Sequence, residues 1–148
     1  MGETNTKVTL DAIQIHQYAA TWEEAIKITA QPLVNKGSIR TAYVSAMINS
    51  VNEMGPYIVL MPGFALAHSA PSSDVIQSDL SIAVFDNPIR FYSDNDPVYV
   101  VMCLACTDHT SHIKRLQLIA QHFLDDDQLI NKIRLCGKRQ DLQHLLFT

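Results

Sequence analysis

The stretch Val98-Tyr99-Val100-Val101-Met102-Cys103-Leu104 decides the fold class of this chain of 148 residues. It is β-branched, aromatic and almost wholly apolar, which is typical of a central strand whose two faces are both covered. The shorter run Tyr57–Met61 has a similar character, and we expect it too to be a strand buried on both faces. Because helices are what cover both faces of such a sheet, the sequence predicts an α/β fold.

The two helices expected before these strands begin and end at recognisable signals. Thr21-Trp22-Glu23-Glu24 has the form of a capping box, which predicts a helix that runs to about Asn35 and has Gly37 as its C-cap. A second helix is expected over residues 40–54, where apolar side chains recur at helical spacing until Gly55-Pro56 ends the pattern. We therefore expect two consecutive helices before the run Tyr57–Met61.

Four further segments are predicted to supply strands. Residues 10–18 alternate between apolar and polar side chains, which indicates a first strand. Phe64–Ala67 continues the apolar run to His68 after Pro62-Gly63 interrupts it. Leu80–Phe85 is the next strand, and Pro88–Phe91 is its expected partner across a turn at Asp86-Asn87.

The remaining third of the chain is predicted to be helical. Thr110 or Ser111 can cap a helix that follows the central strand, and Asp125–Asp127 and Asp141 stand where short helices would begin. The order is strand, two helices, several strands, then helices. That order predicts a three-layer α/β sandwich with a mixed sheet of about five strands flanked by helices. We expect residues 1–148 to form a single domain, with residues 1–7 as a polar, flexible tail.

Composition excludes several classes of function. The formal net charge is −4, and no cluster of Lys and Arg provides the basic surface that nucleic-acid binding requires. No apolar run approaches the roughly 20 residues that span a bilayer. Three cysteines, an odd number, do not make a disulfide framework and point to a reducing compartment. We therefore expect a cytoplasmic domain with no nucleic-acid partner.

Two constellations other than a histidine pair are open to a chemical interpretation. Cys103-x-x-Cys106-x-x-His109-x-x-His112 has the residue types of a metal site, but its four candidates fall within ten residues, whereas zinc fingers separate their two ligand pairs by a long spacer. We expect buried structural thiols and neither a metal nor a cofactor, with a zinc protein as a lesser alternative. A hydrolase is disfavoured because no G-x-S-x-G elbow exists, and no phosphate-binding P-loop exists either.

The histidines His68 and His112 form the third constellation. His68 follows an apolar strand segment, and His112 lies in the first turn of the helix that follows the strongest strand. Sites in open α/β sheets gather outside the carboxyl ends of strands, and a helix N-terminus there offers free N–H groups to an anion. The positions therefore make an encounter of the two rings a reasonable expectation.

Several motifs resemble one known family over essentially the whole chain. Tyr43-Val44-x-Ala46-Met47-Ile48, Gly55-Pro56-Tyr57-Ile58-Val59 and Pro62-Gly63-Phe64-Ala65-Leu66-Ala67-His68 are similar to the mannitol/fructose-type enzyme IIA domains of the bacterial sugar phosphotransferase system. The Gly55–Val59 stretch and residues 103–113 look most like the ascorbate-specific branch, whose relatives are often labelled pentitol-specific. The sequence departs from the family at Ala67, where proline is usual, and near Ser50, where mannitol-type relatives carry an arginine.

The resemblance implies a phosphoryl carrier. His68 matches the phosphorylated histidine of the family and His112 its second active-site histidine. Phosphate would come from the histidine phosphocarrier HPr, pass to a cysteine of enzyme IIB, and reach a carbohydrate, L-ascorbate by branch likeness, entering through the membrane component IIC. The alternative is a regulatory relative that takes the phosphate as a signal. Whether Arg40 replaces the family arginine, whether His109 takes part, and whether the chain forms a homo-oligomer are left open.

Overall fold

A computed structural model describes residues 7–146 and has the α/β architecture that the sequence predicts, with a mixed five-stranded sheet between helices. A short 3-10 helix, Leu10–Ala12, precedes the first strand. The strands are β1 (Ile13–Gln17), β2 (Val59–Met61), β3 (Gly63–Ala67), β4 (Asp79–Ile89) and β5 (Val98–Ala105). The helices are α1 (Trp22–Asn35), α2 (Thr41–Met54), α3 (His109–Asp125), α4 (Leu129–Leu135) and α5 (Arg139–Leu145).

The sheet has the strand order β1-β4-β5-β3-β2 and mixes both pairing directions. β1 runs parallel to β4 and β3 parallel to β5, whereas β4–β5 and β2–β3 are antiparallel. In the parallel pair, Ala67 at the end of β3 lies opposite Cys103 of β5. The chain therefore leaves β3 and β5 at the same edge of the sheet, which is where the functional side chains gather.

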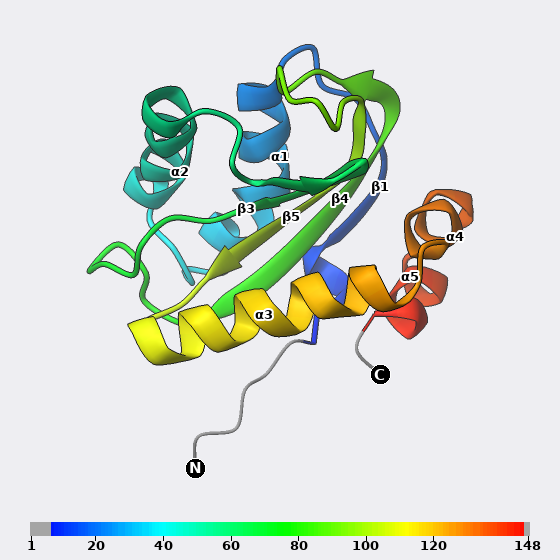
Figure 1. Cartoon of the computed structure of the whole chain (residues 1–148). Helices are drawn as coiled ribbons and strands as arrows, with labels where there is room; N and C mark the ends of the chain where they lie inside the picture. Colours follow the sequence, from blue (N-terminus) through cyan, green and yellow to red (C-terminus); the bar gives the residue numbers. More distant parts are fainter. Residues whose placement is uncertain (1–6, 147–148) are drawn as a thin grey trace.

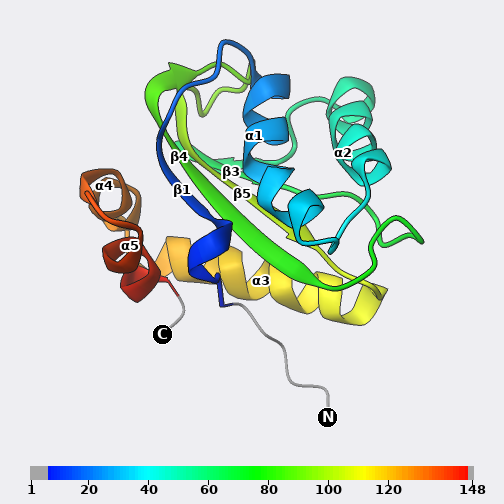
Figure 2. The same cartoon turned by 180° about the vertical axis from the view of Figure 1, so that it is seen from behind.

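Helices cover both faces of this sheet. Figure 1 shows α1 and α2 on one face and the long helix α3 along the other, with α4 and α5 beside β1. The reverse view in Figure 2 shows the same three layers and places the start of α3 next to the end of β5. β5 is buried along nearly its whole length, as expected of a central strand. The predicted three-layer sandwich is therefore confirmed.

The first predicted helix is also confirmed, together with its cap. Thr21 has extended backbone angles, and its hydroxyl accepts a hydrogen bond from the backbone N–H of Glu24 at 3.2 Å, the bond that defines one half of a capping box. The helix ends at Asn35, and Gly37 follows with a φ of 77°, a left-handed angle that glycine adopts without steric cost.

The predicted turn at Asp86-Asn87 is wrong, because β4 runs through it as one strand of 11 residues. The side chain of Asn87 pairs instead with the main chain of Ala19, donating to its carbonyl at 2.7 Å and accepting from its N–H at 3.2 Å. The chain reverses later, where the carboxylate of Asp96 accepts hydrogen bonds from three consecutive backbone N–H groups at residues 91–93. The pairing of the next strand, β5, with β4 follows from this later turn.

Three smaller expectations also need correction. Residues 10–12 form the 3-10 helix, so the first strand begins only at Ile13. β2 was expected to be buried on both faces, but it is the last strand in the order of the sheet and has β3 as its neighbour. Leu60 on β2 is exposed, so β2 is an edge strand. Helix α3 is capped by Asp108, whose carboxylate accepts from the backbone N–H of Ser111 at 2.8 Å, and not by Thr110 or Ser111. Asp108 takes the capping role because its carboxylate is an acceptor at the positive end of the helix dipole.

The predicted tail, residues 1–7, lies outside the described residues except for Lys7. Over residues 7–146, no helix has both the length and the apolar character needed to cross a membrane.

Candidate functional site

The parallel pairing of β3 with β5 brings His68 and His112 together. His68 is the first residue after β3, and His112 lies in the first turn of α3, which follows β5 after three residues. The centroids of the two imidazole rings are 5.6 Å apart and the ring planes are inclined at 53°. Two histidines that are 44 positions apart in the sequence thus share one site, as the positions of the predicted strands suggested.

The imidazole of His68 is fixed by its own backbone. Its Nδ1 lies 2.7 Å from the carbonyl oxygen of Leu66. A carbonyl can only accept, so Nδ1 must carry the proton and Nε2 is left with its lone pair. The ring is thereby oriented with a nucleophilic nitrogen free.

Burial keeps both rings in their neutral form. Desolvation lowers the pKa of His68, and the hydrogen bond to Leu66 opposes this only in part. Desolvation also lowers the pKa of His112, with smaller contributions from the neighbouring His68 and His109. A neutral imidazole is the form that can act as a nucleophile, because one of its ring nitrogens keeps a free lone pair.

Two tyrosines hold the main chain that carries His68. The hydroxyl of Tyr57 donates to the carbonyl of His68 at 3.0 Å, and its ring meets the imidazole edge-on, with centroids 5.2 Å apart and planes at 87°. The hydroxyl of Tyr43 accepts from the N–H of Ser69 at 3.0 Å and lies within hydrogen-bonding distance of the carbonyls of Ser69 and Leu104. Both peptide groups after β3 are therefore held by side chains.

The first turns of α3 differ from this segment, because two buried polar atoms there lack partners. His112 is only 8% exposed and Arg115 only 9%, and neither Nδ1 of His112 nor Nε of Arg115 makes a hydrogen bond within the described structure. Unpaired buried polar atoms are costly. Burial raises the pKa of Cys106, and the nearby charge of Arg115 opposes that rise. Hydrogen bonds from Ser111 lower the pKa of Asp108, and Arg115 adds a smaller contribution in the same direction.

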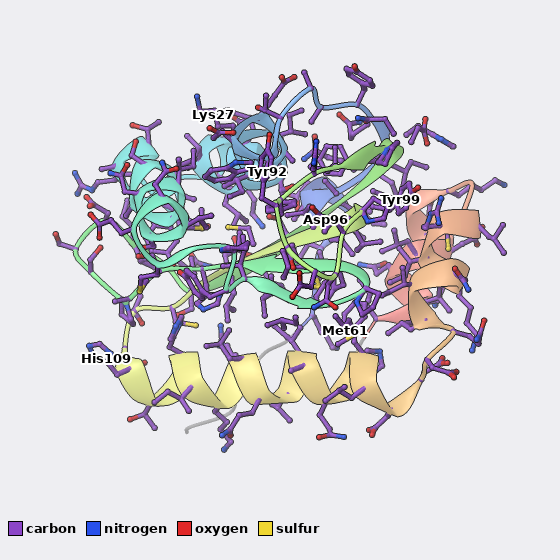
Figure 3. All side chains as sticks on the ribbon, turned by 45° about the horizontal axis from the view of Figure 1, so that its top comes forward. Lys27, Met61, Tyr92, Asp96, Tyr99 and His109 are labelled. Atoms are coloured by element: carbon purple, nitrogen blue, oxygen red, sulfur yellow. The ribbon has the colours of Figure 1, made fainter. Side chains whose placement is uncertain are left out.

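The remaining sequence candidates lie outside this pair. His109 is exposed at the first turn of α3, where Figure 3 labels it at the outer end of the helix. Cys103 and Cys106 are fully buried, and burial raises the pKa of Cys103 to about 12, so the prediction of buried thiols is confirmed. In the range 7–146 no group of three or more His, Cys, Asp or Glu side chains is arranged to hold a metal ion.

The position expected to carry an arginine holds Ser50 on α2. Its hydroxyl lies 3.4 Å from that of Ser69. Burial raises the pKa of Tyr57, and the nearby Ser50 opposes that rise. Arg40 is exposed at the N-cap of α2, and its backbone N–H donates to Asp74 in the loop after His68. The described contacts of Ser50 therefore bring hydroxyl groups, and not a guanidinium, to this side of the site.

The tyrosines are the residues that the sequence analysis missed. Tyr43 lies within the predicted helix over residues 40–54 and is fully buried, but its hydroxyl reaches the chain beside His68. Tyr57 begins the predicted strand Tyr57–Met61. Its only signal was the Gly55-Pro56-Tyr57 stretch, since a tyrosine held just before an edge strand can point its hydroxyl at the neighbouring strand end.

The chain resembles characterised proteins over nearly its whole length. Residues 7–148 match the family described as the EIIA 2 domain of the phosphoenolpyruvate-dependent sugar phosphotransferase system. One relative in Escherichia coli K12, described as the phosphotransferase IIA component SgcA, is 32% identical over 122 residues, 82% of this chain and 85% of the relative. The ascorbate-specific EIIA component of the same strain is 29% identical over 138 residues, 91% of this chain and 88% of the relative.

Solved structures agree with the fold. The mannitol IIA of Escherichia coli superposes with a TM-score of 0.81 at 22% identity, covering 94% of this chain and 98% of the other. In its complex with phosphorylated mannitol IIB, the same IIA superposes with a TM-score of 0.80 at 22% identity, covering 94% and 96%. The mixed sheet with its flanking helices is thus the architecture of mannitol IIA.

Proposed function

Because the chain belongs to the EIIA type 2 family of the sugar phosphotransferase system, and is therefore a phosphoryl-transfer protein, we propose that it carries the phosphoryl group on Nε2 of His68. The observation that supports this assignment is the bond between Nδ1 of His68 and the carbonyl of Leu66 at 2.7 Å. It leaves Nε2 as the one ring nitrogen with a free lone pair.

The attack on phosphorus requires little covalent work from the protein. Phosphoryl transfer depends mainly on in-line positioning and on stabilisation of the three equatorial oxygens. Nε2 of His68 forms the new N–P bond while the bond from phosphorus to the donor nitrogen breaks, and the donor nitrogen keeps that electron pair. Nδ1 retains its proton throughout, and the carbonyl of Leu66 offsets the positive charge that the ring acquires as it attacks.

His112 is the second residue of the proposed mechanism. Its ring centroid lies 5.6 Å from that of His68, within reach of a phosphoryl group on Nε2. It stands in the first turn of α3, where the helix dipole favours an anion. We assign to His112 a hydrogen bond to the phosphoryl oxygens. This bond becomes stronger as negative charge accumulates on those oxygens in the transition state.

The phosphoryl group would reach and leave the site by two protein encounters. The donor is HPr in phosphorylated form, and the acceptor is the cysteine of an enzyme IIB, whose sulfur forms an S–P bond as the N–P bond on His68 breaks. These transfers take place in the cytoplasm, and IIB then serves a membrane component IIC. A structural relative, mannitol IIA, is known in complex with its phosphorylated IIB, which supports the second encounter.

The carbohydrate we favour is L-ascorbate. The support is the likeness to the ascorbate-specific EIIA component at 29% identity across 91% of this chain. The substrate itself never touches this protein in such a chain of transfers, so the choice of IIB partner decides it.

A two-stage transfer experiment tests this function. The purified protein is incubated with radiolabelled phospho-HPr, then with a panel of IIB domains that includes ascorbate-, mannitol- and fructose-specific types. We expect an acid-labile, base-stable label on the wild-type chain, and passage of that label to the ascorbate-type IIB at the highest rate. A chain that takes no label would contradict the carrier assignment. Faster passage of the label to another IIB would contradict only the assignment of ascorbate as the carbohydrate.

A further inference from the structure

Four hydroxyl groups surround the two residues that follow β3, and their arrangement goes beyond what a core requires. They belong to Tyr43 and Ser50 on α2, Tyr57 before β2, and Ser69 itself. The two tyrosine hydroxyls bond to the main chain at His68 and Ser69, and the hydroxyl of Ser50 lies 3.4 Å from that of Ser69. The convergence of α2 and the residue before β2 on these peptide groups points to a positioning function.

Tyr57 makes two different contacts with the same histidine. Its hydroxyl donates to the main-chain carbonyl of His68 at 3.0 Å, and its ring packs edge-on against the imidazole at a centroid distance of 5.2 Å. The first contact fixes the peptide from which the side chain departs. The second limits rotation of the ring about its bond to the main chain. Together with the bond from Nδ1 to Leu66, they determine where Nε2 points.

Ser50 on α2 lies beside this arrangement. Its hydroxyl is 3.4 Å from that of Ser69, the residue after His68. Burial raises the pKa of Tyr57, and Ser50 is close enough to its phenol to oppose that rise. Ser50 therefore stands between Tyr57 and the residue after His68, where its hydroxyl can support the orientation of the phenol.

We propose that Tyr57, with Ser50 as its support, is a positioning residue for phosphoryl transfer that holds the imidazole of His68 with Nε2 aimed at the incoming phosphorus. This inference rests on the proposed function of His68. It concerns the rate of the chemical step, since Tyr57 is argued to act through His68 and to touch neither protein partner.

The test replaces single hydroxyl groups and keeps the rings. Tyr57→Phe removes the bond to the His68 carbonyl and leaves the aromatic packing. We expect the maximal rate of label transfer from phospho-HPr to fall about three- to tenfold, the range that corresponds to one hydrogen bond, with an unchanged half-saturating concentration of phospho-HPr. Ser50→Ala should cause a smaller fall in the same direction, and Ser50→Thr, which keeps the hydroxyl, should restore the wild-type rate.

Tyr99→Phe is the matched control. Tyr99 is a half-buried tyrosine at the start of β5, close to α4, where the guanidinium of Arg134 lies 3.6 Å from its ring centroid, and Figure 3 shows it at the opposite end of the sheet from His109. Loss of its hydroxyl should leave the transfer rate unchanged.

A spectroscopic readout separates positioning from general loss of structure. In the ¹⁵N spectrum of the imidazole rings, wild-type His68 should show one tautomer with the proton on Nδ1, and Tyr57→Phe should show a mixture of tautomers at unchanged thermal stability. Wild-type rates and an unaltered tautomer in both Tyr57→Phe and Ser50→Ala would overturn the inference and leave the carrier assignment intact. Absence of label on the wild-type chain would instead remove the function on which the inference rests.

Discussion

The segment Ala67–Ser69 and the first turns of α3 meet at the candidate site, yet they satisfy their polar atoms to different degrees. In the first, the ring nitrogen Nδ1 of His68 and the peptide groups of His68 and Ser69 are bonded to Leu66, Tyr57 and Tyr43. In the second, Nδ1 of His112 and Nε of Arg115 are buried without a partner in the described structure.

This difference matches two different tasks in one transfer. A nucleophile must already be aimed before the substrate arrives, because disorder in its position reduces the fraction of productive encounters. A group that stabilises the transferred anion must instead keep hydrogen-bonding capacity in reserve until the anion is present. The first segment is built for aiming, and in the second the unpaired Nδ1 of His112 retains that capacity. Mutations confined to one of the two segments test this difference.

The largest effect is expected from His68→Ala. Without an imidazole at the end of β3 there is no nucleophile, and transfer from phospho-HPr should fall to background. Quantification of protein-bound label after denaturation measures this. His16→Ala is the control, because His16 is an exposed histidine on β1 paired with Asp86, away from the strand ends that form the site. Label that persists on the His68→Ala chain would show that another residue is the acceptor.

A smaller loss is expected from His112→Phe, which keeps a flat ring and removes its nitrogens. The maximal rate of labelling should fall about a hundredfold, the cost of removing one hydrogen-bond donor from a site of developing negative charge. The label should still map to His68. His109→Ala, an exposed neighbour on the same turn, should change the rate by less than about twofold. Equal rates for wild type and His112→Phe would remove His112 from the mechanism.

The pH dependence of labelling tests whether the nucleophile is neutral in its resting state. Since desolvation lowers the pKa of His68, the rate should stay constant down to a midpoint below about 6.5 and then fall about tenfold for each further unit of pH. Stopped-flow labelling at a fixed concentration of phospho-HPr measures this midpoint. The pH dependence of phospho-HPr itself is measured separately, so that its own titration can be subtracted. A midpoint above about 6.5 would mean that the site stabilises the charged ring.

The same shifts have a consequence for stability with a definite sign. For both His68 and His112 the folded pKa is lower than the unfolded value near 6.5, so the unfolded chain binds more protons in that range. The contribution of the two neutral histidines to the free energy of unfolding is fully present above about pH 6.5 and is lost as the pH falls below that value. The free energy of unfolding should therefore decline on acidification, and the decline should be shallower in His112→Phe. Urea denaturation at several pH values can measure it.

The smallest effect is expected from Arg115→Met. The charge of Arg115 acts on the neighbouring Cys106 and Asp108, and its Nε has no hydrogen-bond partner in the described structure. Methionine has a similar length, so the substitution removes a desolvated polar group at little cost in stability. The free energy of unfolding should change by less than about 1 kcal/mol and the labelling rate by less than about twofold. A large loss of rate at normal stability would place Arg115 among the groups that bind the phosphoryl oxygens.

Local sequence signals predicted the layers of the fold but not every boundary. The central strand and the helix capped by Thr21 were predictable because a long apolar, β-branched run and a capping box are both local sequence patterns. The run through Asp86-Asn87 was not, because its continuity depends on a bond between Asn87 and Ala19, 68 positions away. The edge position of β2 likewise depends on the strand order of the whole sheet.

The site divides in the same way. His68 and His112 were identifiable because each follows a strand, and strand ends are where sites form. The contributions of Tyr43 and Tyr57 were not, since their hydroxyl groups reach the histidine segment from other elements, at separations of 26 and 11 positions. Only the register of the folded sheet shows which main-chain groups those hydroxyls meet.

The most direct test of the central claim identifies the phosphorylated nitrogen itself. The ¹⁵N-labelled protein is phosphorylated with phospho-HPr, and long-range proton–nitrogen and phosphorus–nitrogen correlations assign the modified ring. We expect a single phosphohistidine, with phosphorus on Nε2 of His68 and the proton retained on Nδ1. Phosphorus on Nδ1 of His68, or on any other residue, would contradict it.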